Sequence, residues 1–257
     1  MIGGLIMIDT HCHILSEYYD NIDEEIEKIK EAGVKAIIVN GTNMKNCQEV
    51  LRLVSKYDIV YGAIGFHPTE LEDVNLDCLD FIEKNISNDK IVAIGEIGLD
   101  YHYDNTDKEK QQLFFRRQLE IASKYHKPVI IHSRDAIGDT YNILKEYSVG
   151  GTLHCYSGSL EMAREFTKLG ICLGIGGVCT YNNAKNIIEV IKNINLEYIL
   201  LETDAPYLTP VPYRKYANSP KYLGVIANKI ADVKGISYDD VVRTTTANAG
   251  RIFDIYR

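Results

Sequence analysis

In this 257-residue chain, histidines and acidic residues repeatedly occur directly after short apolar runs. Eight residues share that position: His11, His13, His67, Glu96, His132, His154, Glu202 and Asp204. Imidazole nitrogens and carboxylate oxygens are the usual protein ligands of first-row transition metals. Four of the imidazoles with two or three of the carboxylates form a ligand set suited to two divalent ions about 3.5–4 Å apart. We therefore expect a two-metal centre, with zinc favoured by the imidazoles and magnesium or manganese as alternatives.

The strongest local signal is the segment DTHCH at residues 9–13. Side chains alternate along a strand, so His11 and His13 should point the same way and Cys12 the other way. Both imidazoles could then reach one metal ion at about 2.0–2.1 Å. An H-x-H pair alone is weak evidence, but its position after the first apolar run favours a role as ligands.

The carboxylates show similar spacing. Glu96 lies in GEIGLD at residues 95–100, where glycines let the backbone turn and leave space beside the side chain. Because a carboxylate has two oxygens, Glu96 can bridge two cations, which an imidazole cannot do. Glu202 and Asp204 are again two residues apart, so both should face the same side. Burying two carboxylates together is costly without cations, which favours a metal cluster.

Other residues nearby are candidates for handling substrate. His67 in GFHP could orient a substrate oxygen or act as an acid, with stabilisation of its own loop as the alternative. Arg134 should open a helix, where anions are favoured, and could hold a phosphate or carboxylate, with a surface ion pair as the alternative. Ser133 beside it is a second substrate-binding candidate. Asp204 and Glu202 are the candidates for taking up and delivering a proton.

One repeating pattern must position these residues: a short apolar run, a loop, and a segment of helical periodicity such as 23–32 or 109–125. The apolar runs are residues 5–8, 36–39, 60–65, 91–94, 129–131, 151–153, 171–175 and 198–201. They recur about every 25–30 residues, the size of a βα unit, and none clearly alternates polar with apolar positions. Eight such units predict an α/β fold, a (β/α)8 TIM barrel, with a doubly wound open sheet as the alternative.

The chain has no linker-like segment, so residues 1–257 are interpreted as one domain. Residues 222–257 should supply the eighth helix and a short C-terminal helical extension. In such a barrel the catalytic side chains lie at the C-terminal ends of the strands, which is where the histidines and acids fall.

Composition narrows the class of protein further. The chain is 46% hydrophobic and 25% charged, which is typical of globular proteins and excludes disordered and fibrous ones. No apolar run approaches the roughly 18 residues of a membrane span, and the net charge of −8 argues against broad coating of nucleic acid. Six cysteines without a C-x-x-C pair indicate reduced thiols and a cytoplasmic location. Met1 and Met7 are alternative starts, and no obligate protein partner is indicated.

Taken together, the motifs resemble the TatD family of metal-dependent hydrolases, within the amidohydrolase-like group of barrels. The resemblance covers nearly the whole chain in order: IDTHCH at 8–13, GFHP at 65–68, GEIGLDY at 95–101, HSRDA at 132–136, HCYSG at 154–158, ETDAPYL at 202–208, PVPYR at 210–214 and NAGRIF at 248–253. It implies a (β/α)8 fold and a two-metal centre bridged by Glu96, with the ligands His11, His13, Glu96, His132, His154 and Asp204. One departure is Lys215-Tyr216, where the family tends to have Gly-Lys after the arginine.

The activity usually assigned to the family is metal-dependent deoxyribonuclease. We therefore expect hydrolysis of phosphoesters by activated water, with DNA as partner and its single-stranded or frayed ends as substrate. One alternative is an amide, lactone or aminoacyl-ester hydrolase, for example one acting on D-aminoacyl-tRNA. Many amidohydrolase barrels bridge their metals with a carboxylated lysine after strand four, and Glu96 at that position favours the nuclease branch. The other alternative is a non-catalytic metal-binding protein.

Overall fold

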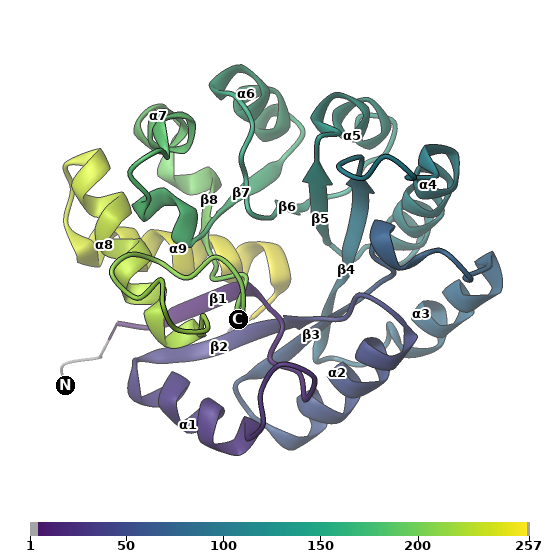
Figure 1. Ribbon diagram of the computed structural model, residues 1–257, viewed down its shortest axis with the longest axis horizontal. Coiled ribbons are helices and arrows are strands. Elements are labelled where there is room, and N and C mark those ends of the chain that lie inside the picture. Colours follow the sequence, from purple (N-terminus) through teal and green to yellow (C-terminus); the bar gives the residue numbers. More distant parts are fainter. Residues whose placement is uncertain (1–4, 256–257) are drawn as a thin grey trace.

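The computed structural model describes residues 5–255, in which strands and helices alternate along the chain (Figure 1). The strands are β1 (Met7–Cys12), β2 (Val34–Asn40), β3 (Val60–Ile64), β4 (Ile91–Asp100), β5 (Val129–Arg134), β6 (Gly151–Leu153), β7 (Ile171–Ile175) and β8 (Ile199–Leu201). The helices are α1 (Ile22–Glu31), α2 (Met44–Lys56), α3 (Asp80–Asn85), α4 (Lys108–Tyr125), α5 (Ile137–Leu144), α6 (Leu160–Lys168), α7 (Lys185–Asn193), α8 (Leu223–Lys234) and α9 (Tyr238–Phe253). Met1, one of the two predicted starts, lies outside the described residues.

The strands form one parallel sheet in the order β1 to β8, with helices around it (Figure 1). The last strand returns to the first through a parallel bridge between Cys12 and Ala205. The His13 amide donates to the Ala205 carbonyl at 2.7 Å, and the Thr10 hydroxyl donates to the Leu201 carbonyl at 3.0 Å. These contacts close the sheet, so the predicted (β/α)8 barrel is confirmed and the open sheet is excluded.

Local chemistry sets the ends of the helices. In α1 the Asn21 side chain accepts a hydrogen bond from the Glu24 amide, which caps the first turn, while Ile26 and Ile29 are buried against the barrel. Helix α4 ends at His126 in a left-handed conformation, two residues before Pro128. The two predicted helical segments, 23–32 and 109–125, therefore agree with α1 and α4 to within about one residue.

Several strands, including β1, β4 and β5, run farther toward the C-terminus than their apolar residues indicate. The predicted runs at 5–8 and 91–94 correspond to β1 (Met7–Cys12) and β4 (Ile91–Asp100), so His11 and Glu96 lie inside strands rather than after them. The reason is that both strands continue to pair with their neighbours while their side chains change from apolar to polar. Gly98 is paired with His132, and Asp100 with Arg134.

The N-terminal half of the barrel interior is apolar. On β2, Ala36 and Ile38 join an inner cluster with Ile8 and Leu200, whereas Ile37 and Val39 pack in the outer cluster that includes the surrounding helices. Helix α9 completes the inner cluster with the buried side chains of Ala249 and Phe253, and Ile255, two residues after the helix, joins them. The predicted C-terminal extension is thus present, but it is a 16-residue helix that closes one end of the barrel rather than a short cap.

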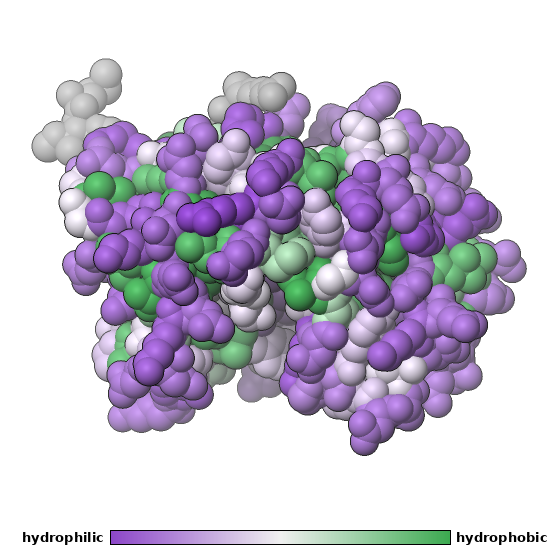
Figure 2. Space-filling view, turned by 90° about the horizontal axis from the view of Figure 1, so that it is seen from above, coloured by the Kyte–Doolittle hydropathy of each residue, from purple (hydrophilic) through white to green (hydrophobic). Residues whose placement is uncertain are grey.

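The surface is mainly hydrophilic in the view of Figure 2, and a notch divides its lower edge into two lobes. That edge is the side of the molecule that faces the reader in Figure 1. No helix within residues 5–255 is long and apolar enough to span a membrane.

Closure of the barrel by α9 should contribute strongly to stability. Phe253 is 1% exposed, so Phe253→Ala is expected to lower the free energy of unfolding by about 3–5 kcal/mol. The matched control is Leu113→Ala on α4, where the side chain is 46% exposed and the expected loss is below about 0.5 kcal/mol. Urea denaturation of the two variants measures the difference, and equal small losses would contradict a structural role for α9.

Candidate metal centre

Six predicted ligands from five strands come together at the C-terminal end of the barrel. Three groups of side chains place their donor atoms within 4.8 Å of one another: His11 with His13 and Asp204, His11 with Glu96 and His154, and His67 with Glu96 and His132. Because parallel strands end at the same edge of a barrel, residues far apart in sequence converge there. The predicted ligand set is therefore assembled in full.

Glu96 lies at the centre of this cluster, with its two oxygens facing different partners. Its Oε2 atom is 3.5 Å from His11 Nε2 and 3.4 Å from His13 Nε2. Its Oε1 atom is 3.1 Å from His132 Nδ1 and 2.8 Å from His154 Nε2. Each oxygen of one carboxylate thus faces a different pair of imidazoles, which suits a bridging ligand, and the rings of His11 and His154 stack between the pairs with centroids 3.9 Å apart.

Asp204 completes the group around the H-x-H pair. Its Oδ1 atom is 3.5 Å from His11 Nε2 and 3.6 Å from His13 Nε2, and the two Nε2 atoms are 3.1 Å apart. Cys12, between the histidines, directs its thiol to the Ile38 carbonyl at 3.5 Å. The alternation predicted from the sequence therefore holds: the two imidazoles converge and the thiol points elsewhere.

The donor atoms fit divalent cations. Burial lowers the pKa of His11 to about 4, so this imidazole stays neutral and offers a lone pair. Burial alone would raise the pKa of Asp204, but its hydrogen bonds with His11 and His13 lower it, so the carboxylate stays ionised. Among the described residues, only histidines lie within ion-pair distance of Glu96 and Asp204. Imidazole nitrogens crowded beside two buried carboxylates form a donor set that suits a divalent metal ion, which would displace ring protons where it binds.

His67 also belongs to the cluster, although the sequence indicated only a substrate-handling role. Its Nε2 atom is 3.4 Å from Glu96 Oε1, and its ring centroid is 4.4 Å from that of His132. Its Nδ1 atom is 2.7 Å from the Thr69 hydroxyl, which fixes the orientation of the ring. The structure therefore adds His67 to the candidate ligands and retains it as a candidate contact to substrate.

Asp100 has a role that sequence reasoning missed. Its Oδ2 atom is 3.0 Å from His132 Nε2, on the side of the ring opposite Glu96. Carboxylates in this position orient a ligand histidine and increase its basicity. In the sequence, the feature that could have indicated this role is the spacing of four residues between Glu96 and Asp100. That spacing places both side chains on the same face of one strand.

His13 is oriented in a similar way by the backbone. Its Nδ1 atom lies 3.0 Å from the Asn40 carbonyl, which leaves Nε2 to face the cluster. Asp9 supports the same region from below, because its carboxylate accepts hydrogen bonds from the His11 amide and from Thr203. These bonds join the end of β1 to the segment after β8.

Glu202 lies deeper than its spacing from Asp204 predicts. Strand β8 ends at Leu201 and Asp204 has a φ of +56°, so side chains do not alternate between these acids. The Glu202 Oε1 atom accepts from the Cys155 amide and is 3.8 Å from His154 Nδ1. Burial raises the pKa of Glu202. A side chain on Gly174 would collide with this carboxylate, so the glycine makes room for it.

The two predicted substrate-binding residues point in different directions. Arg134 is the last residue of β5 rather than the start of α5, and its guanidinium lies 5.8 Å from the Tyr103 ring centroid. Ser133 hydrogen-bonds through its hydroxyl with the Thr140 hydroxyl on α5 at 2.9 Å. Arg134 is exposed near the cluster, whereas Ser133 is engaged with the surrounding helix.

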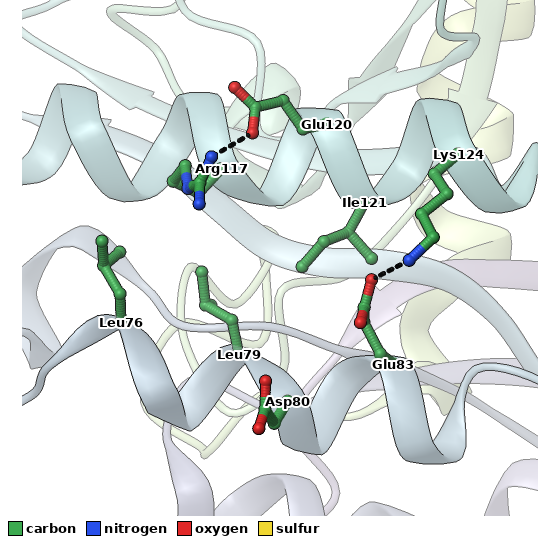
Figure 3. A pocket seen from close by; sticks show the side chains of 8 residues that line it. All are labelled: Leu76, Leu79, Asp80, Glu83, Arg117, Glu120, Ile121 and Lys124. Carbon is green, nitrogen blue, oxygen red and sulfur yellow. Dashed lines mark hydrogen bonds and ion pairs between the residues drawn. The ribbon is translucent and has the colours of Figure 1, made fainter.

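A separate pocket lies on the outside of the barrel, between α4 and the segment that includes α3 (Figure 3). Leu76, Leu79 and Ile121 form its apolar part, and an ion pair of 2.7 Å between Lys124 and Glu83 crosses it. This pocket contains none of the metal ligands.

The fold and this cluster together define a barrel-type metal-dependent hydrolase, with its candidate ligands at the strand ends. The family model described as TatD related DNase matches residues 8–254. The chain therefore belongs to the TatD family, as its motifs indicate.

Comparison with individual relatives supports the assignment to this family. The metal-dependent hydrolase YabD of Bacillus subtilis is 41% identical over 254 residues, covering 97% of this chain and 100% of that protein. The metal-dependent hydrolase YcfH of Escherichia coli K12 is 33% identical over 258 residues, covering 98% and 97%. Among solved structures, the TatD homolog YjjV of Escherichia coli K12 matches with a TM-score of 0.91 at 32% identity, covering 97% of this chain and 98% of that one.

More distant structures share the fold alone. An organophosphorus hydrolase from Deinococcus radiodurans matches with a TM-score of 0.68 at 15% identity, covering 97% of this chain and 93% of that one.

Replacing Asp100 should weaken metal binding without removing a ligand. Asp100→Asn keeps the shape of the side chain but loses the charge that holds His132, so we expect metal affinity to fall about 10–100-fold. The matched control is Asp135→Asn, because Asp135 holds the exposed His102 in a similar contact of 2.9 Å outside the cluster. Competition with a chelator measures both affinities, and an unchanged affinity in Asp100→Asn would contradict this role.

Metal uptake should also strengthen as the pH rises. Burial alone would lower the pKa of His132, but hydrogen bonds with Asp100 and Glu96 raise it to about 9. At neutral pH the imidazole therefore holds both ring protons, and a cation binding at Nδ1 must displace one. Below that pKa, the displaced proton should weaken binding about tenfold for each unit of acidification. Titration calorimetry in buffers of different ionisation enthalpy counts the protons, and a count of zero at pH 7 would contradict this protonation state.

Proposed function

We propose that this protein hydrolyses phosphodiester bonds of DNA, as a TatD-type deoxyribonuclease with two divalent metal ions. The observation that carries the proposal is the position of Glu96, whose two carboxylate oxygens each face a different pair of imidazoles. A pair of divalent cations suits displacement at phosphorus because it can contact both the attacking and the leaving oxygen. The description of the matching family supports DNA as the substrate.

Each ion would have its own ligands besides Glu96. His11, His13 and Asp204 would hold one ion, and His132 and His154 the other. Imidazole donors favour zinc, with magnesium or manganese as alternatives. When bound, such ions polarise phosphoryl oxygens and lower the pKa of water to about 7.

The protein itself would supply proton transfer and orientation. Asp204 is ionised and 13% exposed, so its carboxylate can accept the proton that water loses. Glu202 is fully buried beside His154, so it is better placed to orient that ring than to exchange protons with substrate, although both acids are proton-transfer candidates. His67 and the exposed Arg134 would steady the phosphate, because both lie at the edge of the cluster.

The surface charge of the protein favours a limited contact with DNA. With a net charge of −8, extended binding along a duplex would be repulsive, so a single-stranded or frayed end that reaches the centre is the favoured substrate. The cysteines within the described residues are free thiols, which supports a reducing location such as the cytoplasm.

Removing the metal should abolish hydrolysis. We expect chelator treatment to reduce DNA cleavage to background and divalent ions to restore it, because the ligands alone provide no nucleophile. Glu96→Ala should lose both bound metal, by elemental analysis, and turnover. The control is Glu146→Ala, an exposed acid paired with Arg116 on the outside of the barrel. A metal-free Glu96→Ala protein with full activity would overturn the proposal.

Substrate class is tested on the same preparations. Single-stranded DNA, duplex DNA, an aminoacyl-tRNA and simple phosphoesters are compared for kcat/KM with the metal-loaded protein. We expect single-stranded DNA to be the best of the four. Turnover of the aminoacyl ester without cleavage of DNA would instead identify an esterase on the same metal centre.

A further inference from the structure

A cavity of about 520 Å³ lies next to the metal centre, between the segments that follow β3 and β4. Residues 68–72 form one side, and Tyr103, residues 105–107, Lys110 and Gln111 form the other. Its volume is within the range of pockets that bind small organic molecules. None of the metal ligands lines it, so it is a separate compartment.

Two sets of contacts connect this cavity to the metal centre. On one side, Thr69 lines the cavity and its hydroxyl holds His67 Nδ1 at 2.7 Å. On the other side, the Gln111 side-chain amide donates to the carbonyls of Pro68 and Asp100, and Asp100 in turn holds His132. A ligand in the cavity would therefore be separated from side chains of the metal cluster by Thr69 on one side and by Gln111 with Asp100 on the other.

The cavity wall disfavours a phosphate. It carries three carboxylates, Glu70, Glu72 and Asp107, against the single ammonium of Lys110, a formal charge of −2. Hydrogen-bonding groups are plentiful, and Tyr103 provides an aromatic ring that is 53% exposed. A planar uncharged ligand with amino groups suits this wall, because the ring can stack on it and the carboxylates can accept its hydrogen bonds.

Arg134 marks the side where an anion would lie. Its guanidinium lies 5.8 Å from the Tyr103 ring centroid, and its backbone is paired with that of Asp100 in the sheet. Arg134 is therefore a neighbour both of an aromatic residue that lines the cavity and of the carboxylate that holds His132. A phosphate beside Arg134 would have its attached nucleoside directed toward Tyr103.

We propose that this cavity is a nucleobase pocket, in which an unpaired base stacks on Tyr103 while its phosphate lies at the metal centre. The inference rests on the proposed function, because it assigns the base of the same nucleic-acid substrate. It also accounts for the proposed preference for single-stranded or frayed ends, since a base must leave its pair to enter the cavity.

A fluorescent variant tests base binding directly. The chain contains no tryptophan, so Tyr103→Trp introduces a single tryptophan that keeps an aromatic face in the cavity. With the metal-loaded protein, 2′-deoxyadenosine should quench its emission saturably, and 2-deoxyribose 5-phosphate, which lacks the base, should not. The control is Tyr125→Trp, at an exposed tyrosine of α4 that also has a cation, Lys124, over its ring. Equal quenching in both variants, or none, would overturn the pocket.

Kinetics with base-free DNA provide the second test. Tyr103→Ala should raise KM for an oligodeoxyadenylate about tenfold with a smaller change in kcat, the effect expected from loss of one stacked base. On a fully abasic strand of the same length, Tyr103→Ala and the wild type should have equal KM. Tyr103→Phe should restore most of the affinity for the normal strand. An equal loss on both strands would mean that Tyr103 acts only through Arg134 and the phosphate, and would overturn the proposal.

The two proposals fail separately. DNA cleavage by the wild type without any effect of base or of Tyr103 refutes the pocket and leaves the nuclease function. Saturable quenching by deoxyadenosine without cleavage of any DNA supports the pocket and refutes the nuclease function.

Discussion

The buried negative charge of Glu96 is the constraint on which the rest of the structure depends. Its side chain is 4% exposed at the centre of the barrel, where an uncompensated carboxylate would be strongly unfavourable. Five imidazoles surround it, and they arrive from the ends of β1, β3, β5 and β6. A closed parallel barrel brings many strand ends to one point without exposing a sheet edge. This architecture therefore supplies the imidazoles that compensate the charge of Glu96.

The same constraint divides the barrel into two halves. Toward the N-terminal ends of the strands the interior is filled by small and branched apolar side chains, and α9 covers it with Phe253. Toward the C-terminal ends the interior is filled by polar side chains that hold one another, such as Asp9 with Thr203 and Asp100 with His132. The apolar half provides hydrophobic stabilisation, which allows the polar half to be arranged for binding cations.

The sequence predicted what depends on local periodicity and missed what depends on pairing between strands. Eight apolar runs at regular spacing predicted the barrel with an open sheet as the alternative, and alternation within β1 placed His11 and His13 together. The same rule misplaced Glu202, because the backbone after β8 is no longer extended. The role of Asp100 follows from the register that sets Gly98 beside His132, and no local pattern contains that register.

The acidic character of the chain is consistent with a nucleic-acid substrate when the charges of the outer surface and of the barrel mouth are considered separately. Many carboxylates lie on the outer surface, on helices such as α1 and on the loops between helices, and several are paired with lysine or arginine. At the mouth, Arg134 and cations bound by the cluster would attract a phosphate, while Glu70 and Glu72 line a compartment that an uncharged base could enter. In the proposed nuclease, attraction limited to one point would allow a strand to bind by its phosphate and leave after cleavage, because the net charge of −8 disfavours retention of the product elsewhere on the protein.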